Sequence, residues 1–156
     1  MLIDPMSIPI KGPWGHDETT LFLAESTYPV RLAAVASDGF PRVVSLWYRS
    51  RVLTLECVTH RDAPLVKLLA ANANVGFEIS PNDPPYHGVR GQGIATISPL
   101  AESDTLDWMV SHYLGDSDSQ VGRWLLSRRE QEVVIKIEPQ RLFSWDYRER
   151  MADVSS

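Results

Sequence analysis

The fold is decided by residues 30–78, which read VRLAAVASDGFPRVVSLWYRSRVLTLECVTHRDAPLVKLLAANANVGFE. Apolar residues fill a first strand over 30–37, and Asp38-Gly39 is a typical hairpin turn. The return strand over 41–48 alternates between two faces, as a half-buried strand does. A turn at 49–51 leads to a third strand over 52–58. The segment therefore predicts three consecutive antiparallel strands.

A polar step follows the third strand. It reads Thr59-His60-Arg61-Asp62 and leads into a helix that we expect Asp62 to cap, with Pro64 in the first turn. Backbone N–H groups at a helix start favour anions, and so does an arginine guanidinium. The step thus indicates a phosphate site, although a solvated turn with an ordinary cap explains the same residues. Lys67, one turn inside the helix, either joins this anion site or faces water.

The rest of the chain places further strands and helices around this segment. The Pro- and Gly-rich residues 1–16 predict an extended arm, and Asp17 is expected to cap the helix that follows it. Further strands are expected over 75–80, 86–97 and 132–138, and further helices over 103–114 and 118–128. About six strands with short turns predict a small antiparallel barrel. We assign residues 17–150 to this one domain, between the arm (1–16) and a frayed tail (151–156).

Composition narrows the classes of function. A chain of 156 residues predicts one domain, and a net charge of −5 argues against a nucleic-acid-binding protein. The single cysteine, Cys57, excludes an intrachain disulfide, and the four histidines lack the spacing of metal ligands, so no metal site is expected. No apolar run reaches the roughly 18 residues of a membrane span, and no secretion signal is seen. We therefore expect a cytoplasmic protein without membrane contact.

Three further motifs each allow a functional and a structural interpretation. Gly91-Gln92-Gly93 predicts a β-bulge, a close approach of a ligand or partner, or both. Val44-Ser45-Leu46-Trp47 offers strand backbone groups to a heteroaromatic ring, or is a half-buried strand with a core tryptophan. Trp145-Asp146-Tyr147 covers a pocket or a dimer seam, or is simply tail packing.

Taken together, these segments resemble the pyridoxamine 5′-phosphate oxidase-like, FMN-binding split-barrel superfamily. The resemblance spans residues 28–147 and rests on the order and spacing of five stretches, which are 31–41, 43–47, 59–72, 88–93 and 137–147. It implies a mainly β protein, a split antiparallel β-barrel with peripheral helices. It also implies a homodimer with two flavin sites at the subunit interface.

The resemblance also implies which residues hold the cofactor. The isoalloxazine ring would lie against Val44, Ser45, Leu46 and Trp47, and the ribityl chain and phosphate against Glu56, Cys57, Thr59, His60 and Arg61. Lys67 would be a further phosphate contact, and Gln92 and Trp145 would come from the partner subunit. The chain departs from the family at Leu65, where many relatives carry a basic phosphate ligand. Arg61 and Lys67 are the candidates to replace it.

We therefore expect an FMN-binding oxidoreductase that acts on a small molecule. The departure at Leu65 keeps open an F420-dependent reductase and a non-enzymatic, ligand-binding barrel. A structural or nucleic-acid-binding barrel is disfavoured by the acidic charge. Oxidation of vitamin B6 is not expected, because the substrate residues of true pyridoxamine phosphate oxidases are missing. In this superfamily the flavin does the redox chemistry, and no side chain stands out as a catalytic acid or base.

Overall fold

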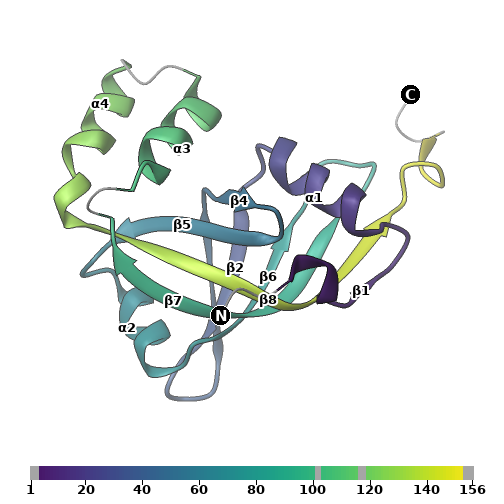
Figure 1. Cartoon of the computed structure of the whole chain (residues 1–156), viewed down its shortest axis with the longest axis horizontal. Coiled ribbons are helices and arrows are strands. Elements are labelled where there is room, and N and C mark those ends of the chain that lie inside the picture. The colour runs from purple at the N-terminus through teal and green to yellow at the C-terminus, as the bar shows by residue number, and fades with distance from the viewer. Residues whose placement is uncertain (1–3, 101–102, 116–118, 153–156) are drawn as a thin grey trace.

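The protein is described by a computed structural model that covers residues 4–100, 103–115 and 119–152 (Figure 1). The eight strands are β1 (Ile10–Lys11), β2 (Val30–Val35), β3 (Pro41–Leu46), β4 (Arg49–Arg51), β5 (Thr54–His60), β6 (Asn74–Ile79), β7 (His87–Pro99) and β8 (Glu132–Asp146). The helices are α1 (His16–Glu25), α2 (Pro64–Ala71), α3 (Thr105–Leu114) and α4 (Gln120–Ser127), with 3-10 turns η1 (Pro5–Ser7) and η2 (Arg129–Gln131). None of the helices in this part of the chain is both long and apolar enough to span a membrane.

One sheet holds all the strands and has the order β3-β2-β6-β7-β8-β5-β4. Its neighbours pair antiparallel, and β1 adds a short parallel pair with β8. The end strands β3 and β4 are separated in the chain only by Trp47 and Tyr48. The sheet must therefore curl until its two ends meet at this corner, which makes it a barrel that is split beyond the corner. This confirms the predicted fold class, with eight strands in place of about six.

The corner is held by aromatic residues. The Tyr48 side chain is buried, and its hydroxyl donates to the Leu23 carbonyl of α1 at 2.8 Å. The Tyr48 amide donates to the Tyr113 hydroxyl of α3 at 3.2 Å. Trp47, which lies just past β3, stacks on the Tyr113 ring at 4.9 Å between centroids. Two helices therefore fix the point where the ends of the sheet meet.

The main core fills the inside of the curled sheet. Alternate residues of β2, Val30, Leu32 and Ala34, are fully buried, as expected for a strand with one face in the core. Leu65 and Leu69, four residues apart on α2, lie on one face of that helix and join the same core. Figure 1 shows α2 at the lower left, beside the β2–β3 hairpin that extends beyond the rest of the sheet.

A second, smaller core lies under α3 and α4. It contains Leu100, Leu106, Val110 and Val134, with Leu125 and Leu126 of α4 packed against it. Figure 1 shows the two helices together over one end of β5 and β8. Helix α3 contacts β4 and β5, the strands at one end of the sheet order.

The two predicted helix caps are wrong. The cap of α2 is Ala63, because the residue before Pro64 is driven to an extended conformation, and its methyl side chain cannot hydrogen-bond the helix. Asp62 instead donates its amide to His60 Nδ1 at 3.0 Å. At α1 the cap is Gly15, and Asp17 lies in the first turn, where its charge suits the helix dipole.

Two strand boundaries also differ from the prediction. Residues Arg49–Arg51 form β4 and not a turn, and the turn falls instead at Val52, with φ of 57°. The last strand does not end at Glu138 but continues through Pro139 to Asp146. The register shifts between Gln92 and Gly93, opposite Arg141 and Pro139, so a bulge accommodates the proline. The bulge that Gly91-Gln92-Gly93 predicted is thus confirmed.

The other predicted elements are present with small shifts. The helix expected over 118–128 is Gln120–Ser127, capped by the Ser119 hydroxyl, and residue 118 lies outside the described residues. The arm contains β1, whose Ile10 and Lys11 pair with Leu142 and Phe143, so it joins the sheet. Of the predicted tail, residues 153–156 lie outside the described part of the chain.

Candidate functional site

Two free strand edges border the split of the barrel. One is β3, which pairs with β2 alone in the described part of the chain and therefore presents one unpaired backbone edge there. The other is the second half of β5. Strand β4 pairs with β5 only as far as Glu56, so beyond it, over Cys57–His60, the edge of β5 that faces away from β8 has no partner strand in the described residues. Both free edges adjoin the same corner, because β3 ends at Leu46, β4 begins at Arg49, and Arg49 is the partner of Glu56 in β5. The predicted segments Val44–Trp47 and Cys57–Arg61 thus flank this corner.

The polar step lies at the end of β5. Thr59 and His60 end the strand and are half-buried, whereas Arg61 and Lys67 are exposed. The first turn of α2 has no side-chain cap, but Pro64 lacks an N–H and the Val66 N–H donates to the Ala63 carbonyl at 3.0 Å, so this helix start offers an anion little besides its dipole. Asp62 approaches Arg61 only loosely, with Oδ2 at 4.0 Å from Nε. Two exposed cations beside the helix start suit a phosphate, as the sequence predicted for this step.

The Leu65 side chain does not face this candidate phosphate site. It is only 6% exposed and belongs to the main core. The position where many relatives carry a basic residue is therefore a packing position in this chain. The exposed cations beside the start of α2 are Arg61 and Lys67.

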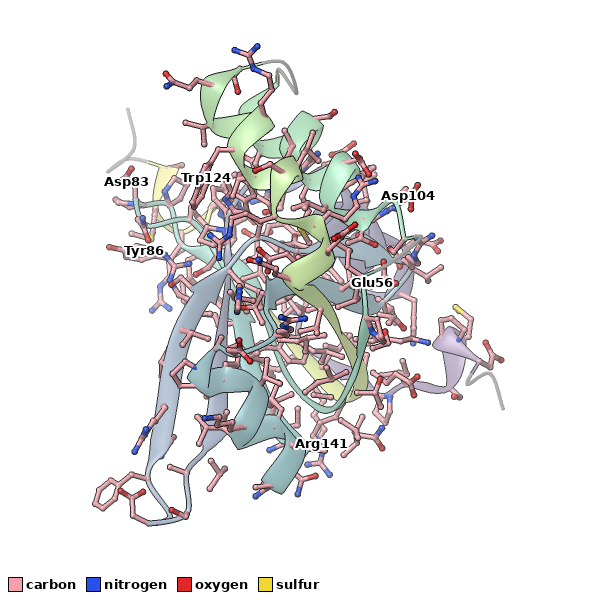
Figure 2. The ribbon with its side chains drawn as sticks, turned by 90° about the vertical axis from the view of Figure 1, so that its left-hand side faces the viewer. Glu56, Asp83, Tyr86, Asp104, Trp124 and Arg141 are labelled. Atoms are coloured by element: carbon pink, nitrogen blue, oxygen red, sulfur yellow. The ribbon has the colours of Figure 1, made fainter. Side chains whose placement is uncertain are left out.

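Two predicted side chains are occupied elsewhere. Glu56 Oε1 accepts hydrogen bonds from Arg51 Nε at 2.9 Å and from Thr105 Oγ1 at 3.2 Å. Asp104, at the start of α3, receives a further bond from Arg49 at 2.9 Å, and Figure 2 labels Glu56 and Asp104 on the same side of the molecule. Cys57 is fully buried, and this burial raises the pKa of its thiol to about 12. The buried Cys57 thiol is thus closed to a cofactor, and the Glu56 carboxylate is already engaged through Oε1.

Gln92 and Trp145 lie on a different surface, the outward face of the sheet. Gln92 pairs with Arg141, and Trp145 follows two strand positions after Phe143, so all four alternate onto this face. Trp145 covers Gly88, where an added Cβ would lie 2.9 Å from its ring. The residues expected from a partner subunit are therefore separate from the split within one chain.

This outward face contains a groove of about 870 Å³, which we call the outer groove. It lies across β1, β2, β3, β6, β7 and β8, and its charged residues are Lys11, Arg31, Glu78, Arg90 and Arg141. Figure 2 shows Arg141 at the lower end of the molecule, away from Asp104 and Trp124 near the α3–α4 end.

Sequence reasoning missed the arginines of the outer groove. They are far apart in the chain, and only the sheet register places them together. A signal was nonetheless present for Arg31, which lies between the buried Val30 and Leu32 and so occupies an outward position of its strand.

The arrangement as a whole defines a split-barrel protein, the fold that the sequence resemblance predicted. A conserved hypothetical protein from Mycobacterium tuberculosis superposes with a TM-score of 0.74 at 22% identity, over 88% of both chains. An F420 reductase superposes with 0.68 at 21% identity, over 83% of this chain and 97% of its own. A FAD-binding protein from Mesorhizobium loti gives 0.62 at 19% identity, over 84% and 93%.

At these identities the likeness is one of fold. No protein-family model matches the sequence, and no curated protein matches it either. The residues of the split and of the outer groove must therefore carry any argument about function.

Proposed function

We propose that this chain binds a flavin-type cofactor in the split of its barrel and acts as an oxidoreductase on a small molecule. The observation that carries the proposal is the pair of unpaired strand edges, in β3 and at the end of β5, that flank the corner, with Arg61 and Lys67 following β5. The F420 reductase and the FAD-binding protein of the same fold support it. FMN is our first choice of cofactor and F420 the alternative.

The residues of the split suit such a cofactor. The unpaired edge of β3 over Val44, Ser45 and Leu46 offers N–H and C=O groups to the polar rim of a flat ring. Arg61, Lys67 and the helix dipole of α2 suit its phosphate. A bound flavin would supply the redox chemistry, and the chain would bind, orient and shield it.

A titration with FMN and with F420, followed by absorbance and fluorescence, tests the proposal. We expect micromolar binding of one of them. Removing both cations in Arg61→Ala/Lys67→Ala should weaken binding about 100-fold, since each charged hydrogen bond contributes roughly tenfold. A matched control, Arg123→Ala/Arg150→Ala, removes two exposed charges elsewhere and should bind as the wild type does. If neither cofactor binds, or if both double variants bind alike, the cofactor site is refuted.

One observation favours a second candidate, a ligand-binding barrel without turnover. Among the described residues, the side chains whose pKa is shifted serve structural contacts, as at Tyr48 and Tyr113 of the corner and Asp146 and Arg148 near the C-terminus. None is a proton donor or acceptor exposed at the split. Rapid reduction of the bound flavin by a nicotinamide donor, coupled to an acceptor, would decide for the oxidoreductase.

We further propose a homodimer in which Gln92 and Trp145 of each subunit reach the cofactor of the other. The position of both residues on the outward face of the sheet supports this proposal. Static light scattering should give twice the 17.6 kDa of the chain, and a monomer would contradict it. A cytoplasmic location remains a proposal that rests on the single free cysteine.

A further inference from the structure

We propose that the outer groove binds an organic anion, a carboxylate or phosphate group on a flat apolar body, and that this anion is the substrate. The second half of this proposal rests on the proposed function, because only a dimer of the kind proposed would bring the groove to a cofactor.

The groove is a concentration of positive charge on an acidic protein. It holds Lys11, Arg31, Arg90 and Arg141 against one carboxylate, Glu78, whereas the whole chain carries −5. Within the described residues none of the four cations forms a salt bridge. A free guanidinium is a strong, planar donor to carboxylate or phosphate oxygens, so these side chains are available to an anionic ligand.

The acid between two of the arginines forms no salt bridge with either of them in the described residues. Glu78 pairs in register with Arg31 on one side and with Arg90 on the other. Its Oε1 instead accepts a hydrogen bond from Ser80 Oγ at 2.7 Å. Arg31 donates Nη2 to Asn82 at 2.6 Å, and its Nη1 is buried without a hydrogen-bond partner in the described residues. A buried donor of this kind is costly unless a ligand accepts from it.

The floor of the groove is small and apolar. Ala33 and Gly76 are register partners at its centre, with Val43 beyond Ala33. A Cβ placed on Gly76 would have no atom nearer than 3.9 Å, so the space above it is open. On the far side, the Arg90 guanidinium lies over the Phe143 ring at 4.4 Å, a surface on which a flat ring can stack. The volume of about 870 Å³ suits a small organic molecule.

Calorimetric titration of the full chain without flavin tests the site. The probes are 2-naphthoate, 2-naphthyl phosphate and the uncharged 2-naphthamide. We expect one of the anions to bind at least about tenfold tighter than the amide, because the amide cannot form the charged hydrogen bonds. Which anion binds tighter distinguishes a carboxylate ligand from a phosphate ligand. Equal binding of all three probes would overturn the proposal.

Two variants test whether the anion binds in the outer groove. Arg31→Gln should weaken binding about tenfold by removing the unpartnered donor, and Gly76→Leu should abolish it by filling the floor. The matched control is Arg42→Gln, which removes an exposed charge from β3 outside the groove. Circular dichroism checks that each variant is folded. If Arg31→Gln binds the probes as the wild type does, the assignment is wrong.

Light scattering and flavin titration on the same samples separate the other outcomes. If no probe binds and Arg31→Gln dissociates a dimer, the groove holds a carboxylate of a second copy, and the proposal is overturned. Flavin binding without anion binding would refute this inference and leave the proposed function intact. Anion binding without flavin binding would uphold the site and refute its role as a substrate site.

Discussion

Replacing Leu65 with arginine, the type of residue that many relatives carry there, should destabilise this protein and not improve its cofactor site. Leu65 is 6% exposed in the main core, and losing its burial costs about 2 kcal/mol. The guanidinium must then stay unpaired among apolar side chains or bend out to water, which costs roughly 1–3 kcal/mol more. We therefore expect Leu65→Arg to lower the free energy of unfolding by about 3–5 kcal/mol, a large part of the roughly 5–15 kcal/mol that domains possess.

Urea unfolding followed by far-UV circular dichroism measures this change. The control is Ala70→Arg, which adds the same side chain at an exposed position of the same helix and should change stability by less than about 0.5 kcal/mol. If Leu65→Arg is as stable as Ala70→Arg and binds FMN more tightly than the wild type, position 65 faces the cofactor. Our account of Leu65 as a packing residue would then be wrong.

Three further predictions concern other parts of the chain. Gly12→Ala should detach the arm and lower the melting temperature, because Gly12 has φ of 105° and an added Cβ would collide with the Ser144 carbonyl oxygen; an unchanged melting temperature would contradict this. Cys57, with its buried thiol, should react with Ellman's reagent only after unfolding, and prompt reaction of the folded protein would show that the core opens. The hydrogen bond from Arg148 holds the pKa of Asp146 well below its usual range, so the stability that Asp146 contributes is present above the ordinary aspartate pKa of about 3.9 and is lost as the pH falls below it. Melting curves between pH 6 and pH 2 should therefore show a shallower acid decline for Asp146→Asn than for the wild type, and identical declines would remove Asp146 from the account.

The sequence was most informative where structure is local. Asp38-Gly39 correctly marked the β2–β3 hairpin, and Gly39 has the positive φ, 84°, that such a turn requires. The sequence was misleading where a local signal, such as a proline, competes with hydrogen-bonded pairing between strands. Pro139 looked like the end of a strand, but long pairing with β7 carries β8 through it with a bulge. Val52 in the turn after β4 has a φ that β-branched residues rarely adopt, so nothing local pointed to it.

The candidate site shows the same limit. Thr59, His60 and Arg61 were found because they are consecutive, and their relation to Val44–Trp47 followed from the family resemblance. The engagement of Glu56 by Arg51 and Thr105 depends on where α3 packs, which no pattern in the sequence reveals. The outer groove depends on the register of six strands and so became visible only in the folded chain.

The open edge of β3 also bears on self-association. An uncovered strand edge recruits other strands and can start aggregation, and proteins commonly guard such edges with proline and charge. In β3 the residues of this kind are Pro41 and Arg42, which lie at the end of the strand next to the hairpin turn. The inner half, Val43–Leu46, lacks them and is the segment offered to a cofactor ring. A chain that keeps this half ready for a ligand is also exposed to unwanted pairing there whenever the ligand is absent, so ligand supply and solubility of the protein should be linked.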